Sequence, residues 1–134
     1  MHIEMLTGRG TIDDFYGKSG YLEKIQRYPD QLGMRLLVEA LRKSASPLSA
    51  YGMTHMHELG LRPVDDEKTQ ELVSIMAVDQ YSYFIKYLLP EEAQGPWPYA
   101  WVQGNATSVE QATEMVLTAI RMSKGWTGIL LKPQ

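Results

Sequence analysis

Residues 78–89 form the most apolar segment of the chain and constrain its fold more than any other feature. Their apolar and aromatic members are Val78, Tyr81, Tyr83, Phe84, Ile85, Tyr87, Leu88 and Leu89. Pro90 ends the segment, and Asp65 and Asp66 lie upstream, where acidic residues favour a helix start. The sequence therefore predicts a helix from Asp65 or Asp66 to Leu89. Since a helix that is apolar all round is normally enclosed, residues 78–89 should form the centre of the fold or a homodimer interface.

The chain is predicted to form a single domain, residues 1–134. A length of 134 residues suits one ordinary domain, and no repeat or Gly-, Ser- or Pro-rich linker separates a second one. With 44% apolar and 22% charged residues, the composition is that of a globular protein. The chain has no cysteine, which excludes disulfides, iron–sulfur clusters and cysteine-based zinc sites.

Helical signals dominate the first half of the sequence. Ile3 and Met5 indicate a short edge strand, and a helical turn is expected at Ile12–Tyr16. Apolar residues at helical spacing predict one helix over residues 19–28 and a second after Asp30, with a stripe of Leu32, Leu36, Leu37, Ala40 and Leu41. Residues 47–59 should form a third, because Ser46-Pro47 is a typical helix start and Gly60 a typical stop.

The last forty residues have a different pattern. Tyr99–Gln103 has the composition of a strand, and Thr107 with Glu110 has the spacing of a capping box that opens a helix ending near Lys124. Trp126–Lys132 then reads as a final strand. The predicted fold class is α+β: mostly helical, with four to five helices and a small sheet that includes this C-terminal strand–helix–strand unit.

The distribution of charge favours a basic protein partner over nucleic acid. The net charge is −3, and residues 47–94 contain three basic and eight acidic residues, among them Asp65, Asp66 and Glu67. A chain without a basic stripe lacks the usual means of holding a phosphate backbone. No segment has the apolar length of a membrane span or the pattern of a secretory signal, so we expect a cytosolic protein without a membrane contact.

Three aromatic residues after Gly95-Pro96 are the main candidates for partner binding. Trp97, Tyr99 and Trp101 alternate with smaller residues, so on a strand their rings would project from one face. Such a row could anchor a protein interface, where Trp and Tyr are enriched, or it could pack in the core against the helix of residues 108–122. The two readings differ in whether the rings are exposed in the free protein.

An alternative site involves acidic and imidazole side chains. Asp79 and Tyr83 lie in the apolar segment, where a carboxylate must be paired, solvated or functional. His55 and Glu58 are spaced to share one face of a helix, but the histidines at 55 and 57 would point apart, so we predict no metal site. No sequence motif requires a cofactor.

These patterns favour a non-catalytic protein-binding protein of the small inhibitor, immunity or adaptor kind. The expected contact surface combines the acidic central region with the aromatic residues. The alternative is a small enzyme or ligand-binding domain with a site around Asp79 and His55.

Overall fold

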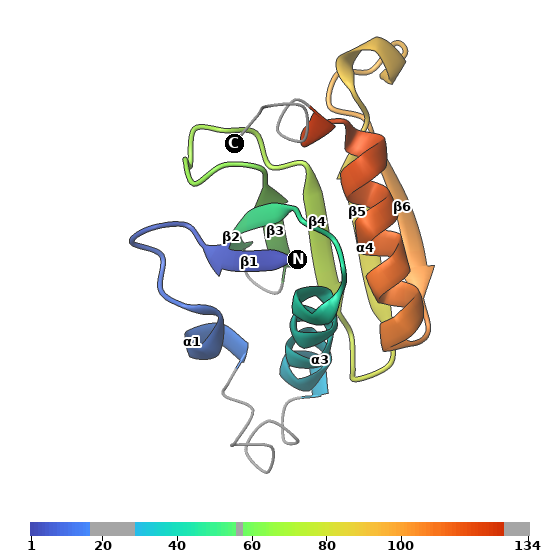
Figure 1. Ribbon diagram of the computed structural model, residues 1–134. Coiled ribbons are helices and arrows are strands. Elements are labelled where there is room, and N and C mark those ends of the chain that lie inside the picture. Colours follow the sequence, from blue (N-terminus) through green and yellow to red (C-terminus); the bar gives the residue numbers. More distant parts are fainter. Residues whose placement is uncertain (17–28, 56–57, 128–134) are drawn as a thin grey trace.

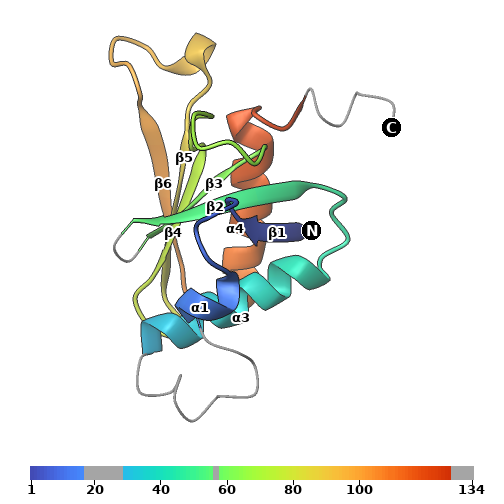
Figure 2. The ribbon, with the colours of Figure 1, turned by 90° about the vertical axis from the view of Figure 1, so that its left-hand side faces the viewer.

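A computed structural model describes residues 1–16, 29–55 and 58–127. Within these residues, six strands form one mixed sheet in the order β1-β2-β3-β4-β5-β6, and two long helices cover one face (Figures 1 and 2). The elements in chain order are β1 (His2–Met5), α1 (Ile12–Tyr16), α3 (Pro29–Lys43), β2 (Ser49–His55), β3 (Glu58–Arg62), β4 (Val73–Ala77), β5 (Tyr83–Leu88), β6 (Trp101–Ala106) and α4 (Val109–Ser123). The prediction of a mostly helical fold with a small sheet is therefore wrong.

Most of the sheet is a meander of neighbouring strands. β1 pairs with β2 in parallel, and each later strand pairs antiparallel with the one before it. α3 provides the crossover between β1 and β2, as parallel neighbours require. Consecutive hairpins then place the turns alternately at the two ends of the sheet, which determines which loops are neighbours.

Two predicted helices are strands. Residues 47–59 contain β2 and the start of β3, and residues 65–89 contain β4 and β5. In β5 the side chains of Tyr83 and Ile85 are buried, with Phe84 less so between them. Burial that alternates from one residue to the next is typical of a strand with one face in the core. The segment therefore does not need to be surrounded by other elements on all sides.

The two long helices and the N-terminal elements match the sequence-based expectation. β1 and α1 form at the predicted positions. In α3, Leu32, Leu37 and Leu41 of the predicted stripe are buried, whereas Leu36 and Ala40 are only partly buried. α4 is capped one residue later than predicted: Ser108 accepts a hydrogen bond from the Gln111 backbone N–H at 3.1 Å. The side chain of Gln111 accepts from the Thr107 N–H at 2.9 Å, one residue before the N-cap, so only the serine half of a capping box forms.

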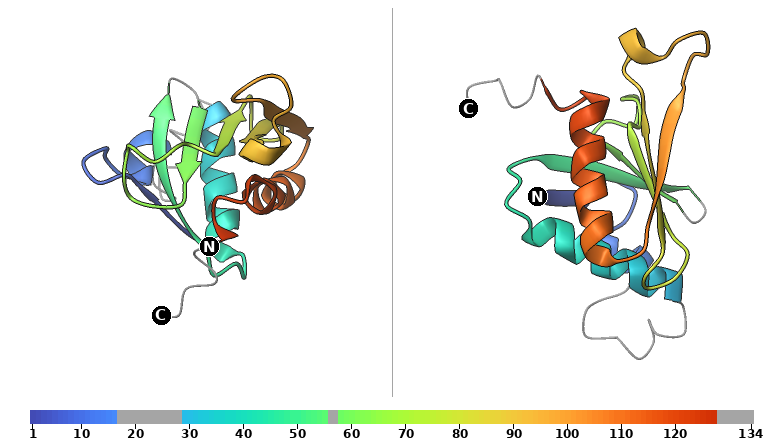
Figure 3. Two further views of the ribbon diagram at one scale, coloured as in Figure 1. Left: turned by 90° about the horizontal axis from the view of Figure 1, so that it is seen from above. Right: turned by 90° about the vertical axis from the view of Figure 1, so that its right-hand side faces the viewer.

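The core lies between the two helices and one face of the sheet. Its best-buried members include Leu37 of α3, Val116 of α4 and Ile75 of β4. Residues between the core-facing positions of the strands point to the opposite face, called here the open face because no helix of the described residues covers it (Figures 2 and 3). The predicted helix of residues 19–28 and most of the predicted last strand lie outside the described residues. Trp126 belongs to that strand by prediction but is a buried turn residue.

Candidate functional site

The loop between β5 and β6, residues 89–100, extends beyond the end of the sheet (Figure 2). It carries two exposed aromatic rings. Trp97 is 72% exposed and Tyr99 is 67% exposed. β6 begins only at Trp101, so the predicted row of three rings on one strand does not form. Trp97 and Tyr99 belong to the loop, called here the aromatic loop, whereas Trp101 lies on the sheet.

One glutamine side chain holds the aromatic loop in shape. Gln94 donates from Nε2 to the Leu89 carbonyl at 3.0 Å and accepts from the Tyr99 N–H at 3.1 Å. A short 3₁₀ helix, Glu91–Ala93, forms the first part of the loop. Glu92 binds Lys124 at the end of α4 at 3.0 Å. These contacts order the backbone without covering either ring.

Tyr99 has an unusual backbone conformation. Its φ is 58°, in the left-handed region where a large aromatic residue is rarely found. Such strain persists only where neighbouring contacts impose it, and it concentrates at functional positions. Here the hydrogen bond from the Tyr99 N–H to Gln94 contributes to the conformation that points the ring into solvent.

Trp101 is partly buried on the open face at the start of β6. The Lys86 ammonium lies 5.1 Å from the centre of its ring, within range of a cation–π interaction. Lys86 is the charged residue of β5 and pairs across the sheet with Gln103. The third aromatic residue is therefore anchored on the sheet beside the aromatic loop.

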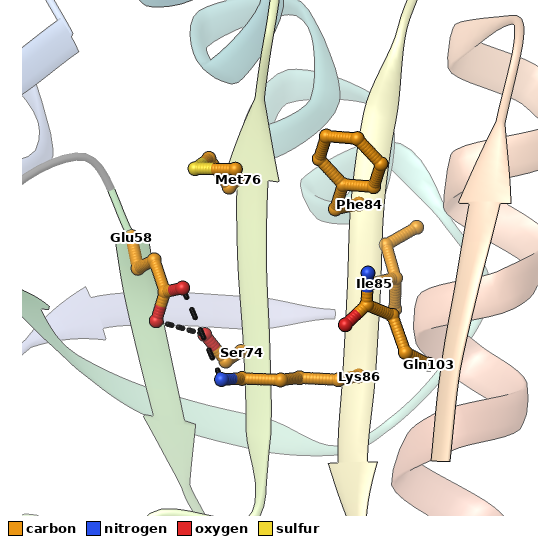
Figure 4. A pocket seen from close by; sticks show the side chains of 7 residues that line it. All are labelled: Glu58, Ser74, Met76, Phe84, Ile85, Lys86 and Gln103. Atoms are coloured by element: carbon orange, nitrogen blue, oxygen red, sulfur yellow. Dashed lines mark hydrogen bonds and ion pairs between the residues drawn. The ribbon is translucent and has the colours of Figure 1, made fainter. Parts of the chain in front are cut away.

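A shallow hollow of about 160 Å³ lies on the open face beside Lys86, the residue that contacts the Trp101 ring (Figure 4 shows the lining of the hollow). Its lining consists of Glu58, Ser74, Met76, Phe84, Ile85, Lys86 and Gln103. The Ser74 hydroxyl donates to Glu58 at 3.0 Å, and the Lys86 ammonium is 3.9 Å from the same carboxylate. Ser74 is only 2% exposed, so its oxygen is poorly placed to attack a substrate. The charges are paired with each other, which fits a structural role better than a catalytic one.

The predicted acidic partner-binding residues lie in the β3–β4 loop and remain exposed. Asp65 accepts hydrogen bonds from the hydroxyl and the backbone N–H of Thr7, and these bonds lower the pKa of its carboxyl group. Glu67 forms an ion pair with Arg9, and Asp66 accepts from the Lys68 N–H at 2.9 Å. Two of these acids thus tie the loop to the N-terminal segment while keeping a negative surface.

The β3–β4 loop lies at the same end of the sheet as the aromatic loop. The Leu88 N–H, at the end of β5, donates to the carbonyl of Leu72, just before β4, at 2.9 Å. Arg62, which is 3% exposed, holds the acidic loop by donating to the carbonyls of Glu67 at 3.1 Å and Thr69 at 2.9 Å. The meander therefore places the two sets of candidate residues at the same end of the sheet, although the sequence separates them by about thirty positions. The contacts of Asp65 with Thr7 and of Glu67 with Arg9 hold the acidic residues beside the segment that follows β1, the edge strand opposite β6.

Of the four residues of the alternative site, Asp79 and Tyr83 lie near each other at the β4–β5 turn, whereas His55 and Glu58 lie elsewhere. Asp79 is in the β4–β5 turn, where its carboxylate accepts from the N–H groups of Tyr81 at 2.7 Å and Ser82 at 2.8 Å. Tyr83 points into the core, where its hydroxyl donates to the Gly33 carbonyl at 2.9 Å and burial raises its pKa to about 12. Asp79 is a turn-forming residue rather than a carboxylate inside an apolar helix.

His55 and Glu58 also have separate partners. His55, at the end of β2, lies 2.9 Å from the Glu71 carboxylate, whereas Glu58 binds Ser74 and Lys86 on the open face. The structure brings none of these groups to Asp79 or Tyr83. Sequence reasoning missed Lys86, Ser74 and Gln94, and only the polar positions of Ser74 and Lys86 within otherwise apolar runs could have indicated the open face.

The apolar segment proposed for self-association is mostly enclosed within the chain. β5 is an interior strand, paired with β4 on one side and β6 on the other, so its edges are unavailable to a second copy. Val78 and Tyr81, at 51% and 61% exposed, are in the β4–β5 turn at the other end of the sheet from the aromatic loop. The nearly all-round apolar helix that motivated the prediction is absent from the described residues.

No cluster of three or more metal-ligating side chains occurs in the part of the chain that the structure describes. None of the helices in that part has the length and apolar run needed to cross a bilayer. Comparison with family models, curated proteins and solved structures finds no match for this chain.

Proposed function

We propose that the chain is a non-catalytic, cytosolic protein-binding protein of the small inhibitor, immunity or adaptor kind, and that the aromatic loop is the centre of its contact surface. The single observation that carries the proposal is the exposure of Trp97 and Tyr99 on an ordered loop. Trp and Tyr are the residues most often found as binding hot spots, and a partner buries them when it binds.

The order of the loop supports a binding role. A flexible loop must be fixed when it binds, at a cost in conformational entropy for each immobilised side chain. Gln94 already fixes the backbone of the aromatic loop in the free protein. The strained φ of Tyr99 is consistent with a loop shaped for presenting its ring.

The surroundings of the loop support a basic partner. Glu91 is exposed next to the rings, and Asp65, Asp66 and Glu67 are exposed at the same end of the sheet. Negative potential at this end of the sheet speeds association with a positively charged partner and helps to select it. Trp101 extends the aromatic surface from the loop onto the open face.

The alternative function, an enzyme or ligand-binding domain around Asp79 and His55, has less support. A site of that kind needs its reactive groups within hydrogen-bond reach of one substrate. Asp79 is engaged in a turn and Tyr83 in the core, while His55 and Glu58 have partners elsewhere.

The proposal is tested by removing the two rings together. Trp97→Ala with Tyr99→Ala should leave the free energy of unfolding within about 0.5 kcal/mol of wild type, because exposed side chains contribute little to the fold. Loss of about 2 kcal/mol at a hot spot weakens binding roughly thirty-fold, so partners captured from the native cell by the wild-type chain should be lost with the double variant.

Tyr81→Ala is the matched control, since Tyr81 is also a highly exposed aromatic residue but lies at the other end of the sheet. Capture should be unchanged by this substitution. Equal capture by wild type and the double variant would contradict the proposal, as would a large loss of stability in the double variant.

A further inference from the structure

The outer edge of β6 is unusually open to another strand. Trp101–Ala106 contains neither proline nor a charged residue, and it pairs with β5 at all six positions without a bulge. No other strand of the described residues lies on its outer side. Proteins normally protect such edges with charges, proline or bulges, because an unprotected edge accepts further strands.

The opposite edge of the sheet has that protection. β1 has four residues and carries His2 and Glu4, both exposed and paired with each other. Arg42 of α3 donates to the Ile3 carbonyl at 3.0 Å. One sheet therefore combines a protected edge with an unprotected one, and the difference suggests that β6 has a partner.

The register shows which backbone groups β6 presents. The Leu89 N–H donates to the Ala100 carbonyl at 2.9 Å, which makes this a hydrogen-bonded pair of the antiparallel ladder. Since such pairs alternate, Val102, Gly104 and Ala106 bond to β5, whereas Trp101, Gln103 and Asn105 direct their N–H and C=O groups outward. The outward groups form a row of three residues centred on Gln103.

We propose that β6 pairs antiparallel with β6 of a second copy of this chain, about a two-fold axis through Gln103. The row of outward groups is self-complementary: Gln103 faces Gln103 of the second copy, and Trp101 faces its Asn105. This pairing makes about six backbone hydrogen bonds and joins the two sheets into one. It brings no charged side chains of β6 opposite each other, because β6 has none.

The side chains toward the helices also fit a second copy. In this register Val102 of one copy lies opposite Gly104 of the other, in the type of pair where cross-strand side chains are closest. Val102 is 39% exposed, and it borders an apolar groove of about 250 Å³ between β6 and α4, which Gly104 and Met115 also line. Gly104 has no side chain and the terminal methyl of Met115 lies over it, so Val102 of the second copy would pack against Gly104 and this methyl group (Figure 3, right, shows α4 beside β5 and β6). Pairing would thus cover both an open edge and an exposed apolar residue.

The test places charges on the two-fold axis. Gln103→Glu and Gln103→Lys each bring two like charges face to face across the axis, and we expect each to weaken dimerisation by about tenfold or more. Mixing the two variants places Glu opposite Lys and should restore a heterodimer. Sedimentation equilibrium at high micromolar concentration measures each species, and His2→Lys, on the protected edge, is the control that should leave the wild-type dimer intact.

Amide exchange gives a residue-level readout of the same pairing. In the dimer the N–H groups of Gln103 and Asn105 should exchange as slowly as those of Val102 and Gly104, and in the monomeric variants only the latter pair should stay protected. A monomeric wild type would overturn the proposal, and so would a dimer unaffected by either charge. Protection of Gln103 and Asn105 only on adding a protein captured through the aromatic loop would assign the edge to that protein instead. The double variant Trp97→Ala with Tyr99→Ala should not affect dimerisation. The β6 pairing can therefore fail its test while the proposed function of the aromatic loop passes, and the reverse.

Discussion

Gly33→Ala should destabilise the protein although it removes a glycine from the interior of a helix. Gly33 lies in α3, where alanine would normally stabilise a helix by about 1 kcal/mol. At this position, a Cβ atom would lie 2.2 Å from the Asp79 carbonyl oxygen and 3.0 Å from the Cβ of Ala77. The first distance is far below the roughly 3.5 Å of an optimal non-bonded contact. The β4–β5 turn therefore packs against the helix at a place that only glycine allows.

The size of the stability loss depends on whether the atoms next to the added Cβ can move away. The obstructing atom is a backbone oxygen in a turn that Asp79 fixes through its hydrogen bonds to Tyr81 and Ser82, so no change of rotamer relieves the overlap. Overpacking typically costs 1–3 kcal/mol, and a rigid neighbour places the cost at the upper end. After subtracting the gain of about 1 kcal/mol in helix propensity, we expect a net loss of about 2 kcal/mol.

Urea unfolding followed by circular dichroism measures this loss. Gly104→Ala is the matched control, because its Cβ would lie 2.6 Å from the terminal methyl of Met115, which can rotate away. At a protein concentration where the chain is monomeric, the control should lose less than about 1 kcal/mol. If Gly33→Ala instead raised the stability by about 1 kcal/mol, the close packing of α3 on the β4–β5 turn would be contradicted.

Two further predictions concern alkaline pH and the same turn. Burial raises the pKa of Tyr16 and Tyr83 to about 12, so the folded state favours the protonated phenols. Their contribution to the free energy of unfolding is therefore complete below pH 10 and is lost as the pH rises toward 12. Urea unfolding should show a stability loss of up to about 2–3 kcal/mol per tyrosine over that interval, and Tyr83→Phe should reduce the loss. Asp79→Ala should cost about 1 kcal/mol by removing the acceptor of two turn hydrogen bonds, whereas Asp79→Asn keeps an acceptor oxygen and should cost less than half as much. A marked stabilisation by Asp79→Asn would instead indicate a buried, unpaired charge.

The sequence predicted the long helices well because their signals are local. The cap and apolar stripe of residues 109–123 depend on neighbours within one or two turns, and the same holds for Pro29–Lys43. The strands from 49 to 88 depend on distant partners. In β2 the core-facing positions are Ala50 and Gly52, which have little or no side chain. The alternation of apolar and polar residues is therefore weak in this strand. Residues 73–88 contain two short apolar runs separated by Asp79–Ser82, and this pattern is typical of a hairpin. When the two runs are taken as one, the same residues predict a helix.

The sequence predicted which types of residue belong to the candidate site, but it did not predict how they are arranged. Aromatic composition identified Trp97, Tyr99 and Trp101, but the start of β6 at Trp101 and the positive φ of Tyr99 decide which rings are exposed, and neither follows from a propensity. The position of the acidic loop and the aromatic loop at one end of the sheet depends on the meander, which the sequence-based topology did not contain. The Gln94 clamp joins residues five positions apart in a way that no known motif describes.

Site-specific photocrosslinking in the native cell tests most directly whether the aromatic loop contacts a protein partner. Photoreactive benzoylphenylalanine in place of Trp97 should give a crosslink to a different protein, and the same group in place of Tyr81, which is also highly exposed but lies at the other end of the sheet, should not. Absence of a crosslink at position 97, the same crosslinks at both positions, or crosslinks only to a second copy of the chain would contradict the proposed function.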